Sequence, residues 1–338
     1  MPSTIKDVAR LAGCSIKTVS RVINDEPHVT DGVRARVQAA IRTLGYAPNI
    51  AARRLVQQKA STLCILMYPG FFQPASAVLS RILDLGYEEN YDIFIQPYYP
   101  TFPRSRNRLV NAIYERRFDG FVTTPPCDSD GFVADLLATY KMPLVQVDPL
   151  ERAGGLPYVA GDDVQGAAAA TRHLLELGHR RIAFLMGPRN LISSAGRLEG
   201  YRSALQVASI PFDPALVLPS EFNFDGGYTA ARQLLGRGPG RPTAIFAGSD
   251  EDAYGALYAA QELSLPVPAA LSICGHDDLP YSARIWPGLT TVHQPTEEML
   301  ERAVRLLIDL LKGDIPAEIH LTLPSRLVMR GSTGPCPA

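Results

Sequence analysis

Several polar side chains stand directly after apolar segments in the C-terminal part of the chain, where they could bind a small molecule. Asp148 ends the run PLVQVD, Ser249 and Asp250 follow TAIFAG, and Asp277 ends LSICGHD. A carboxylate accepts hydrogen bonds from two vicinal hydroxyl groups, and convergent polar groups beside an apolar or aromatic wall form a ligand pocket. These residue types therefore predict the binding of a small polar molecule.

Two further features favour such a site. Arg197 is predicted in the first turn of a helix after MGPRNLISSAG, where its guanidinium can donate two parallel hydrogen bonds. Phe71 and Phe72 follow the first predicted strand and offer an aromatic wall. Other roles stay open, because Asp250 could cap a helix predicted at 251–263 and either phenylalanine could belong to the core.

The same region does not form a recognisable catalytic site. His276, Asp277 and Asp278 could be read as acid–base groups, but adjacent carboxylates of an extended chain point to opposite sides. Asp278 could instead cap a helix or pair with Arg284. The chain contains no G-x-G-x-x-G after a strand, no G-K-[ST], no G-x-S-x-G and no H-E-x-x-H. We therefore expect a binding protein without a cofactor rather than an enzyme.

The cysteines and the apolar runs indicate the compartment. Five scattered cysteines without a C-x-x-C pair argue against a disulfide scaffold or a zinc site and suit a reducing cytoplasm. No apolar run reaches the ~18 residues that span a bilayer, and the N-terminus lacks the apolar stretch of a signal peptide. We expect a cytoplasmic protein that is not attached to a membrane.

Alternating strands and helices must position the polar residues. Apolar runs of strand length, such as TLCILMY, YDIFIQP and RIAFLM, alternate with segments of helical pattern. The predicted helices are 75–86, 104–117, 130–140, 163–177, 196–208, 226–236 and 250–263. The rhythm occurs twice, before and after about residue 160, and indicates parallel sheets covered on both faces in two doubly wound lobes. Ligands of such sheets bind at the carboxyl ends of the strands, where the polar residues stand.

The first 60 residues differ in charge from the rest. They contain ten Lys and Arg against four Asp and Glu, a net charge of +6. The remaining residues contain 23 basic and 30 acidic side chains, a net charge of −7. A basic head on an acidic body indicates that the head alone meets a polyanion.

Three short helices are predicted in this head. TIKDVARLAG opens with Thr4 as N-cap and Asp7 at capping-box spacing, and Gly13 ends the helix. Ser15 can cap a second helix, IKTVSRVIN, and Thr30 a third, DGVRARVQAAIRTLG. The first two read as a helix-turn-helix, whose second helix would enter the major groove of DNA. A three-helix protein-binding module with a basic face is the alternative.

The second helix places four side chains where base edges can be read: Ile16, Lys17, Ser20 and Arg21. Lys or Arg can address guanine O6 and N7, and Ile can contact a thymine methyl group. Other side chains suit phosphates, which position a protein without specifying sequence: Ser15, Thr18, Asn24, Thr30 and Arg34. Double-stranded DNA is therefore the expected macromolecular partner.

Two parts of the chain resemble one family. TIKDVARLAGCSIKTVSRVIND, followed by HVTDGVRARVQAAIRTLGYAPNIAARRL, is similar to the head of the lactose-repressor (LacI/GalR) family of bacterial transcription regulators, with Cys14 in place of the usual valine. GDDVQGAAAATRHLLELGHRRIAFLMG, FAGSDEDAYGAL and SICGHDDLPYSARIWPGLTTVHQP resemble the family's effector domain, to about Pro324. The resemblance implies a two-lobed, periplasmic-binding-protein-like type I fold. It also implies crossovers near residues 160, 290 and 320 and a ligand cleft between the lobes.

The resemblance implies roles for individual residues of this cleft. Arg197 and Asp277 would be the main anchors of the effector, Phe224 its aromatic wall, and Gln294 a contact at the lobe crossover. Asp148 and Ser249 match positions in or beside the pocket. His276 stands where the family often has an aromatic residue, so the edge of the pocket differs here.

The tether PNIAARRLVQQKAS is also explained by the resemblance. Asn49 to Val56 could form a helix, which alone is shorter than the ~12–15 residues needed for marginal stability in water. We expect it to order on the operator, with Arg53 and Arg54 near the minor groove and Leu55, at the family's wedge position, inserted at a base step. A leucine packed on the body is the alternative.

The predicted organisation has three parts. They are a helix-turn-helix DNA-binding domain at 1–47, a hinge helix or linker at 48–60, and an effector-binding and dimerisation domain at 61–338. The last would contain an N-lobe of about 61–160 plus 293–320 and a C-lobe of about 161–292 plus 321–330.

The predicted function is that of a homodimeric, ligand-responsive repressor on a palindromic operator. A sugar is the expected effector, and a nucleobase is the alternative. A sugar-processing enzyme fused to a DNA-binding head and a transport binding protein are the competing hypotheses. The basic head and the missing signal peptide disfavour the transport protein.

Overall fold

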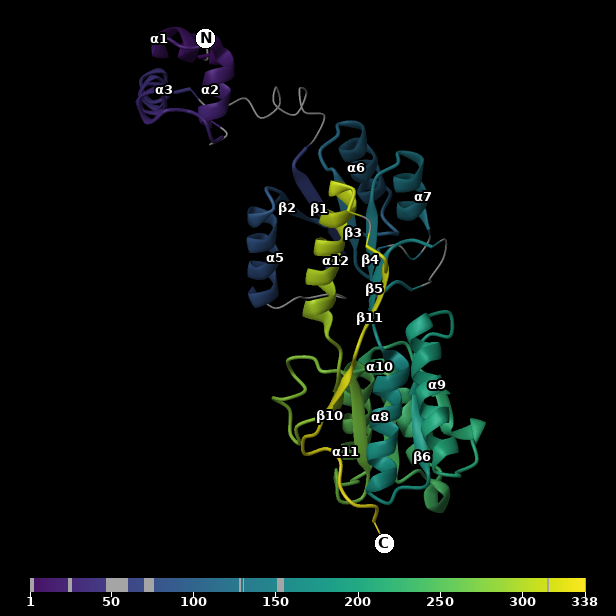
Figure 1. Cartoon of the computed structure of the whole chain (residues 1–338). Helices are drawn as coiled ribbons and strands as arrows, with labels where there is room; N and C mark the ends of the chain where they lie inside the picture. Colours follow the sequence, from purple (N-terminus) through teal and green to yellow (C-terminus); the bar gives the residue numbers. More distant parts are fainter. Residues whose placement is uncertain are drawn as a thin grey trace. The chain divides into compact units, whose positions relative to one another are not determined.

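The computed structural model (Figure 1) describes residues 3–23, 26–46, 60–69, 76–127, 129, 131–150, 155–314 and 316–337. The chain divides into two compact units, Met1–Ala60 and Ser61–Ala338. The described residues of the first unit form helices, and those of the second form two six-stranded sheets with helices around them. The predicted fold class, a helical head and an α/β body with two sheets, is confirmed.

The head contains α1 (Ile5–Ala12), α2 (Ile16–Ile23) and α3 (Asp31–Leu44). Apolar residues at helical spacing bring the three helices together around a small core. This core is formed by Val8, Ala9, Ala12, Val19, Val22, Val37 and Ala40. Burial of these side chains against one another fixes the angle at which α2 is presented.

Local capping signals set the ends of these helices. One carboxylate oxygen of Asp7 accepts hydrogen bonds from the backbone N–H of Thr4 at 3.0 Å and from its hydroxyl at 2.6 Å. Gly13 ends α1 at φ 61°, a conformation that glycine adopts without steric cost. The hydroxyl of Ser15 accepts a hydrogen bond from the N–H of Thr18 at 3.1 Å. Thr30 stands at the N-cap of α3, but its side chain makes no capping hydrogen bond.

Sheet A is parallel throughout and forms the first half of the body. Its spatial order is β11 (His320–Leu323), β5 (Tyr158–Gly161), β4 (Leu144–Val147), β3 (Gly120–Thr123), β1 (Thr62–Met67) and β2 (Asp92–Pro97). Successive side chains of a strand point to opposite faces, so each face of β1 enters a different core. Its Leu63 and Ile65 pack in one core, and its Cys64 and Leu66 in another.

Helices cover both faces of sheet A, as a doubly wound sheet requires. One core lies beneath α5 (Ser76–Glu88) and α12 (Thr296–Lys312). The other lies beneath α6 (Pro103–Tyr114) and α7 (Phe132–Thr139). Figure 1 shows α12 in yellow-green beside the strands of this sheet, although it comes from the far end of the chain.

Sheet B repeats the arrangement with one antiparallel edge. Its order is β12 (Arg326–Val328), β10 (Thr290–His293), β9 (Ser272–Asp277), β8 (Ala244–Ala247), β6 (Ile182–Met186) and β7 (Val217–Pro219), and β12 runs antiparallel to β10. The helices on one face are α8 (Asp163–Glu176) and α9 (Ile192–Val207); those on the other are α10 (Phe224–Leu235) and α11 (Asp250–Glu262). Short 3-10 turns at Pro214–Leu216 and Gly238–Gly240 precede β7 and β8.

The chain passes between the sheets three times. It leaves sheet A after β5, returns to it after β10, and enters sheet B again between β11 and β12. The last passage follows Leu323, three residues later than the predicted crossover near 320. Both sheets are therefore assembled from segments that are distant in the sequence.

Several elements differ from those predicted. Helix α9 begins at Ile192, not at 196, so Arg197 lies in its second turn rather than its first. Helix α12 was not among the predicted helices, although its apolar residues recur at helical spacing. The short strands β5, β7, β10, β11 and β12 were not predicted as strands, and their three or four residues carry too little pattern to identify them.

A buried histidine joins the C-terminal tail to the body. His179 Nε2 lies 3.1 Å from the carbonyl oxygen of Gly334 and 3.0 Å from the hydroxyl of Ser272, and Nδ1 lies 3.0 Å from the hydroxyl of Thr243. A carbonyl can only accept, so Nε2 carries the proton and donates to it, while Nδ1 of the neutral ring accepts from Thr243. Burial lowers the pKa of His179 and favours this neutral form.

Candidate functional site

One face of α2 is turned away from the core of the head. Val19 and Val22 are buried, whereas Lys17 is exposed and the apolar side chain of Ile16 is 45% exposed. An exposed isoleucine at the start of a helix has no role in the core of the head. The exposed start of α2 therefore presents the side chains that a recognition helix would use.

Two arginines of the head meet at the turn after α2. Arg21 lies 3.6 Å from the carboxylate of Glu26, and Arg34 of α3 donates to the backbone carbonyl of Glu26 at 3.2 Å. Ser15 and Thr18 lie at the start of α2, with hydroxyls 2.8 Å apart. These hydroxyl and guanidinium groups lie on short helices that a phosphate backbone can approach.

Seven residues with predicted roles lie outside the described part of the chain. In the head and tether these are Asn24, Asn49, Arg53, Arg54 and Leu55; in the body they are Phe71 and Phe72. Their predicted roles stay predictions.

Arg197 is the centre of a buried polar cluster in the body. Its side chain is only 5% exposed. Nε donates to Asp163 Oδ1 at 2.8 Å, one terminal nitrogen donates to the carbonyl of Gly248 at 2.5 Å, and the other lies 3.4 Å from Asp277 Oδ1. Burial alone would lower the pKa of Arg197, but the attraction of Asp163 and Asp277 outweighs it and raises this pKa, so the guanidinium is charged.

The aromatic neighbour of Arg197 is Phe222, not Phe224. The ring of Phe222 lies 5.1 Å from the guanidinium carbon of Arg197. Phe224 is the first residue of α10, and its ring lies 5.8 Å from that of Tyr258. The signal was in the sequence: Asn223 caps α10 by accepting from Gly226 N–H at 2.8 Å, so the residue before it belongs to the loop after β7.

Asp277 ends β9 beside Arg197 and keeps 29% of its side chain exposed. Its backbone has φ 116°, and Asp148, at the end of β4, has φ 45°. Non-glycine residues rarely adopt such angles, and strain of this kind gathers at functional sites. Both predicted ligand residues therefore stand in unusual backbone conformations at the carboxyl ends of strands.

Ser249, and not Asp250, caps the helix that follows β8. The hydroxyl of Ser249 caps α11 by accepting from the N–H of Asp252 at 3.1 Å, so the proposed capping by Asp250 is wrong. Asp250 is buried and accepts hydrogen bonds from three groups: Leu279 N–H at 2.8 Å and the hydroxyls of Ser282 and Thr291, both at 2.5 Å. Asp250 therefore holds the loop after β9 to the start of α11.

Asp278 also has structural partners. It accepts a hydrogen bond from Arg330 at 2.5 Å and lies 3.0 Å from Nδ1 of His293. The alternative pairing with Arg284 is therefore wrong. His276, the residue before Asp277, is fully buried, and its Nδ1 lies 3.3 Å from Asp277 Oδ1. Burial and the charge of Arg197 lower the pKa of His276, so its imidazole is neutral.

Gln294 is buried and already hydrogen-bonded. Its amide nitrogen donates to Asp163 Oδ1 at 3.1 Å, and its carbonyl oxygen accepts from the hydroxyl of Ser325 at 3.3 Å. Arg197 thus contacts Asp277 directly, and it is connected to Gln294 through their shared acceptor, Asp163.

Carboxyl groups dominate the described surroundings of Asp277. Burial, and after it the charge of Asp277, raises the pKa of Asp250 to about 7 and also raises that of Glu251. Burial is likewise the main cause that raises the pKa of Asp252 to about 7. Asp148 adds negative potential at Arg197. A ligand at this place would meet one buried guanidinium among several carboxyl groups.

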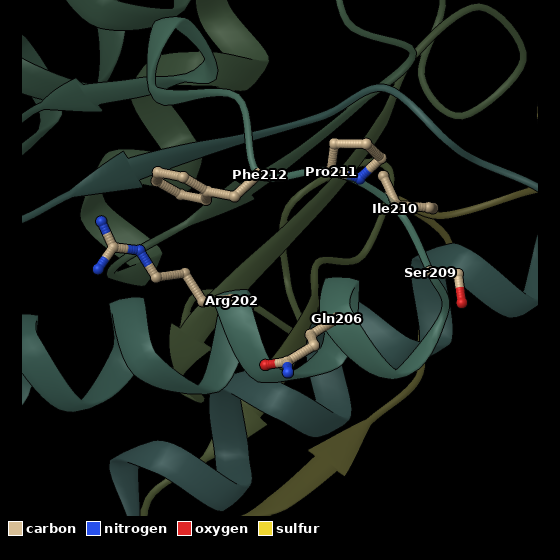
Figure 2. A pocket seen from close by; sticks show the side chains of 6 residues that line it. All are labelled: Arg202, Gln206, Ser209, Ile210, Pro211 and Phe212. Atoms are coloured by element: carbon tan, nitrogen blue, oxygen red, sulfur yellow. The ribbon is translucent and has the colours of Figure 1, made fainter.

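A pocket lies on the surface of α9, away from Arg197. Figure 2 shows Arg202 and Gln206 of this helix beside the following loop, with the guanidinium of Arg202 4.2 Å from the ring centre of Phe212. This pocket has a volume of about 530 Å³. None of the predicted ligand residues lines it.

The described residues form neither a metal site nor a membrane span. No three His, Cys, Asp or Glu side chains among them are grouped so that they could hold a metal ion. No helix in this part of the chain has the length and apolar character needed to cross a membrane.

Two family models match the chain. Residues 4–49 match the model described as bacterial regulatory proteins, lacI family, and residues 171–333 match that of a periplasmic binding protein-like domain. The ribose operon repressor of Escherichia coli K12 is 32% identical over 331 residues, which cover 98% of this chain and 99% of that protein. The transcriptional repressor PurR of Proteus mirabilis is 32% identical over 336 residues, 99% of this chain and 98% of that protein.

Solved structures are similar over nearly the whole chain. The lac repressor dimer bound to operator and the anti-inducer ONPF has a TM-score of 0.81 at 27% identity and covers 99% of this chain and 100% of that one. The complex of the transcriptional regulator CelR with cellobiose has a TM-score of 0.70 at 30% identity, with 98% and 99% coverage.

Proposed function

Because the chain belongs to the lacI family of bacterial regulatory proteins and is a DNA-binding transcriptional repressor, we propose that a small, uncharged, hydroxyl-rich molecule binds beside Arg197 and Asp277 and changes its affinity for operator DNA. Transcription regulators of this family are not enzymes. A sugar is the proposed effector, and a nucleobase is the alternative.

The charge around Arg197 is the observation that carries the choice of ligand. Hydroxyl groups can donate to the partly exposed carboxylate of Asp277 and accept from a guanidinium. A phosphate or carboxylate ligand would instead approach Asp277 and Asp148 with the same sign of charge, which is unfavourable near a buried site. The cellobiose in the CelR complex supports the sugar class, while the ring of Phe222 offers a surface on which a nucleobase could stack.

The exposed face of α2 is proposed to read the operator. Ile16 and Lys17 would contact base edges at the start of the helix, with Ser20 and Arg21 one turn later. Ser15, Thr18, Thr30 and Arg34 would contact phosphates, as would Asn24. The operator in the structure of the lac repressor dimer supports this assignment.

A homodimer is proposed to carry two heads to the two halves of the operator. Two large apolar side chains one turn apart on α5 support it, because Leu83 is 49% and Tyr87 is 86% exposed in the single chain. A second copy of the chain would remove them from water. Such a protein would act in the cytoplasm, where bacterial DNA lies.

The tether is proposed to contribute at the minor groove. Leu55 would enter a base step and kink the duplex, at an unstacking cost of about a few kcal/mol that the added contact of bent DNA offsets. Arg53 would add positive charge there, and Asn49 would begin the helix.

The proposal is tested with operator and ligands together. The full chain selects its operator from a pool of random duplexes, and footprinting is then repeated with ribose, cellobiose, ribose 5-phosphate and adenine. We expect a two-fold symmetric footprint whose affinity falls steeply with salt, and a shift of that affinity by an uncharged sugar. Absence of any specific footprint, with or without ligands, would contradict the proposed binding to an operator. A response to ribose 5-phosphate alone would overturn the charge argument.

A further inference from the structure

All three crossovers between the sheets place a buried residue at one point. Gly161 ends β5, Gln294 follows β10, and Ser325 stands between β11 and β12. A Cβ atom at Gly161 would lie 1.9 Å from Oε1 of Gln294, so only a glycine lets this amide rest directly on the backbone of the first crossover. The three segments therefore meet at one side chain, that of Gln294.

The two ends of this amide bind different crossovers. Its nitrogen donates to Asp163 Oδ1, just after the first crossover, and its oxygen accepts from Ser325 Oγ on the third. Asp163, Gln294 and Ser325 are each no more than 7% exposed, so water does not readily replace a lost partner. The Gln294 side chain thus acts as donor and acceptor at once, whereas an ionised carboxylate of the same shape could only accept.

The same oxygen of Asp163 also accepts from Arg197. Nε of Arg197 lies 2.8 Å from Asp163 Oδ1, and Nε2 of Gln294 lies 3.1 Å from it. Because both hydrogen bonds end on one atom, a displacement of the guanidinium that moves the Asp163 carboxylate also changes the hydrogen bond to Gln294. The chain of contacts runs without a gap from Asp277 through Arg197 and Asp163 to Gln294.

We infer that Gln294 is a positioning residue which holds the three crossovers to Asp163 and thereby links the angle between sheets A and B to the position of Arg197. In this role Gln294 does not need to touch the effector, although the family resemblance implied that it is an effector contact. The inference rests on the proposed function only in taking the Arg197 site as the effector site. A ligand that draws Arg197 towards Asp277 would loosen Gln294 and release the crossovers together.

Exchange of the two polar groups provides the sharpest test. Gln294→Glu removes the donor and faces Asp163 with a second carboxylate, so the sheets should lose their fixed angle. The double change Asp163→Asn with Gln294→Glu restores one amide, one carboxylate and the total charge, and should recover it. Arg197→Gln should shift the angle in the same direction, and its combination with Gln294→Glu should add no further shift.

The angle is measured by single-molecule energy transfer in the full chain. Dyes are attached at Tyr114→Cys on α6 and Val207→Cys on α9, both exposed, in a background in which Cys14 and Cys336 are serine. Labelled chain is mixed with excess unlabelled chain, so that an assembly holds one labelled copy. We expect a shifted or broadened transfer distribution for Gln294→Glu and the parental one for the double variant.

The controls separate positioning from general damage. Gln261→Glu makes the same change at an exposed position of α11 and should leave the distribution unchanged. If Gln294→Glu does not fold, Ser325→Ala, which removes one hydrogen bond, should give a smaller shift in the same direction. A parental distribution for Gln294→Glu and Ser325→Ala in folded chains would overturn the inference, as would failure of the double variant to recover. The measurement needs neither DNA nor effector, so it stays readable if the proposed function fails.

Discussion

Asp163 and Arg197 form a buried ion pair across two neighbouring helices, with 2.8 Å between Oδ1 and Nε. Asp163 begins α8, immediately after the chain has left sheet A, and Arg197 lies in the second turn of α9. The pair therefore connects the first crossover to the place where the charged and aromatic groups of the body gather. Asp163 also binds Gln294 of the second crossover, and Arg197 also contacts Asp277, so the ion pair belongs both to the crossovers and to the candidate ligand site.

Removal of Arg197 should destabilise the body strongly. Arg197→Met leaves Asp163 buried without its counter-charge, and breaking a buried pair in this way costs about 3–5 kcal/mol. Adding Asp163→Asn removes the stranded charge, so the double variant should lose less than the two single losses added together. Urea unfolding of the three variants measures this, and strict additivity would contradict a direct pair.

Replacement of Lys17 should alter which DNA sequence is preferred. Lys17→Ala removes a donor at the exposed start of α2, and a lost base contact costs about 1–3 kcal/mol and relaxes the preference at one base pair. Arg42→Ala, a change of the same charge at an exposed position of α3, is the matched control. Selection from random duplexes measures both; an unchanged base preference for Lys17→Ala would remove Lys17 from the reading face.

Loss of the leucine in the tether should weaken specific DNA binding alone. Leu55→Ala should reduce operator affinity and the bend of the duplex, because a wedge of smaller size cannot hold a base step open. The midpoint of thermal unfolding of the body should not change. Gel mobility of circularly permuted operator fragments measures the bend, and the same bend and affinity in both proteins would defeat the assignment.

Asp252 should make the body less stable as pH rises. Burial raises the pKa of Asp252 from its ordinary value of 3.8 to about 7, so the folded state holds a proton that the unfolded state releases. Its contribution is most favourable below pH 3.8 and is lost as pH rises through 7. The free energy of unfolding of Asp252→Asn, relative to the parent, should therefore increase between pH 5 and pH 8, by on the order of 2 kcal/mol.

The exposed Asp225→Asn in α10 serves as the control for this titration. It shows how much the loss of one exposed carboxyl group changes the free energy of unfolding over this pH range. A change with pH for Asp252→Asn no larger than that for Asp225→Asn would mean that the carboxyl of Asp252 does not carry a proton in the folded protein.

His179 should make the body less stable as pH falls, opposite to the effect of Asp252. Burial lowers its pKa below 6.5, so its stabilisation is present above pH 6.5 and is lost as pH falls through the folded value. His179→Gln keeps hydrogen-bonding groups but cannot take up a proton. The difference between this variant and the parent should therefore move in favour of the variant from pH 7 to pH 5, as measured by urea unfolding. No change with pH would contradict a neutral buried ring.

The head was the part of the fold most readily predicted. Thr4 and Ser15 precede its first two helices and Gly13 follows the first, as predicted, because capping and positive φ act between residues close in sequence. Helix α12 also carries a local pattern from which it could have been predicted, since its buried residues recur at helical spacing. Strands of three or four residues such as β7 and β12 depend on their neighbours in the sheet and have no period of their own.

The site could be predicted in its residue types but not in its connections. Residue type and position drew attention to Arg197, Asp277 and Gln294. Gln294 donates to Asp163, which is 131 positions away in the sequence. This contact exists only because the crossovers meet in the folded chain, so no local sequence pattern could predict it. Phe222 was missed because two phenylalanines stand two residues apart, and the cap at Asn223 decides which of them enters the helix.

The discontinuous sheets have a consequence for the order in which this protein is made. Sheet A begins at Thr62 but receives its edge strand β11 only at residues 320–323, and sheet B is completed by β12 at 326–328. A ribosome delivers the N-terminal end first, so the head, with its own core, can fold while the body is still being synthesised. Neither sheet can be finished until residues 320–328 have emerged from the ribosome. A nascent chain of this protein can therefore carry a folded head before either sheet of the body is complete.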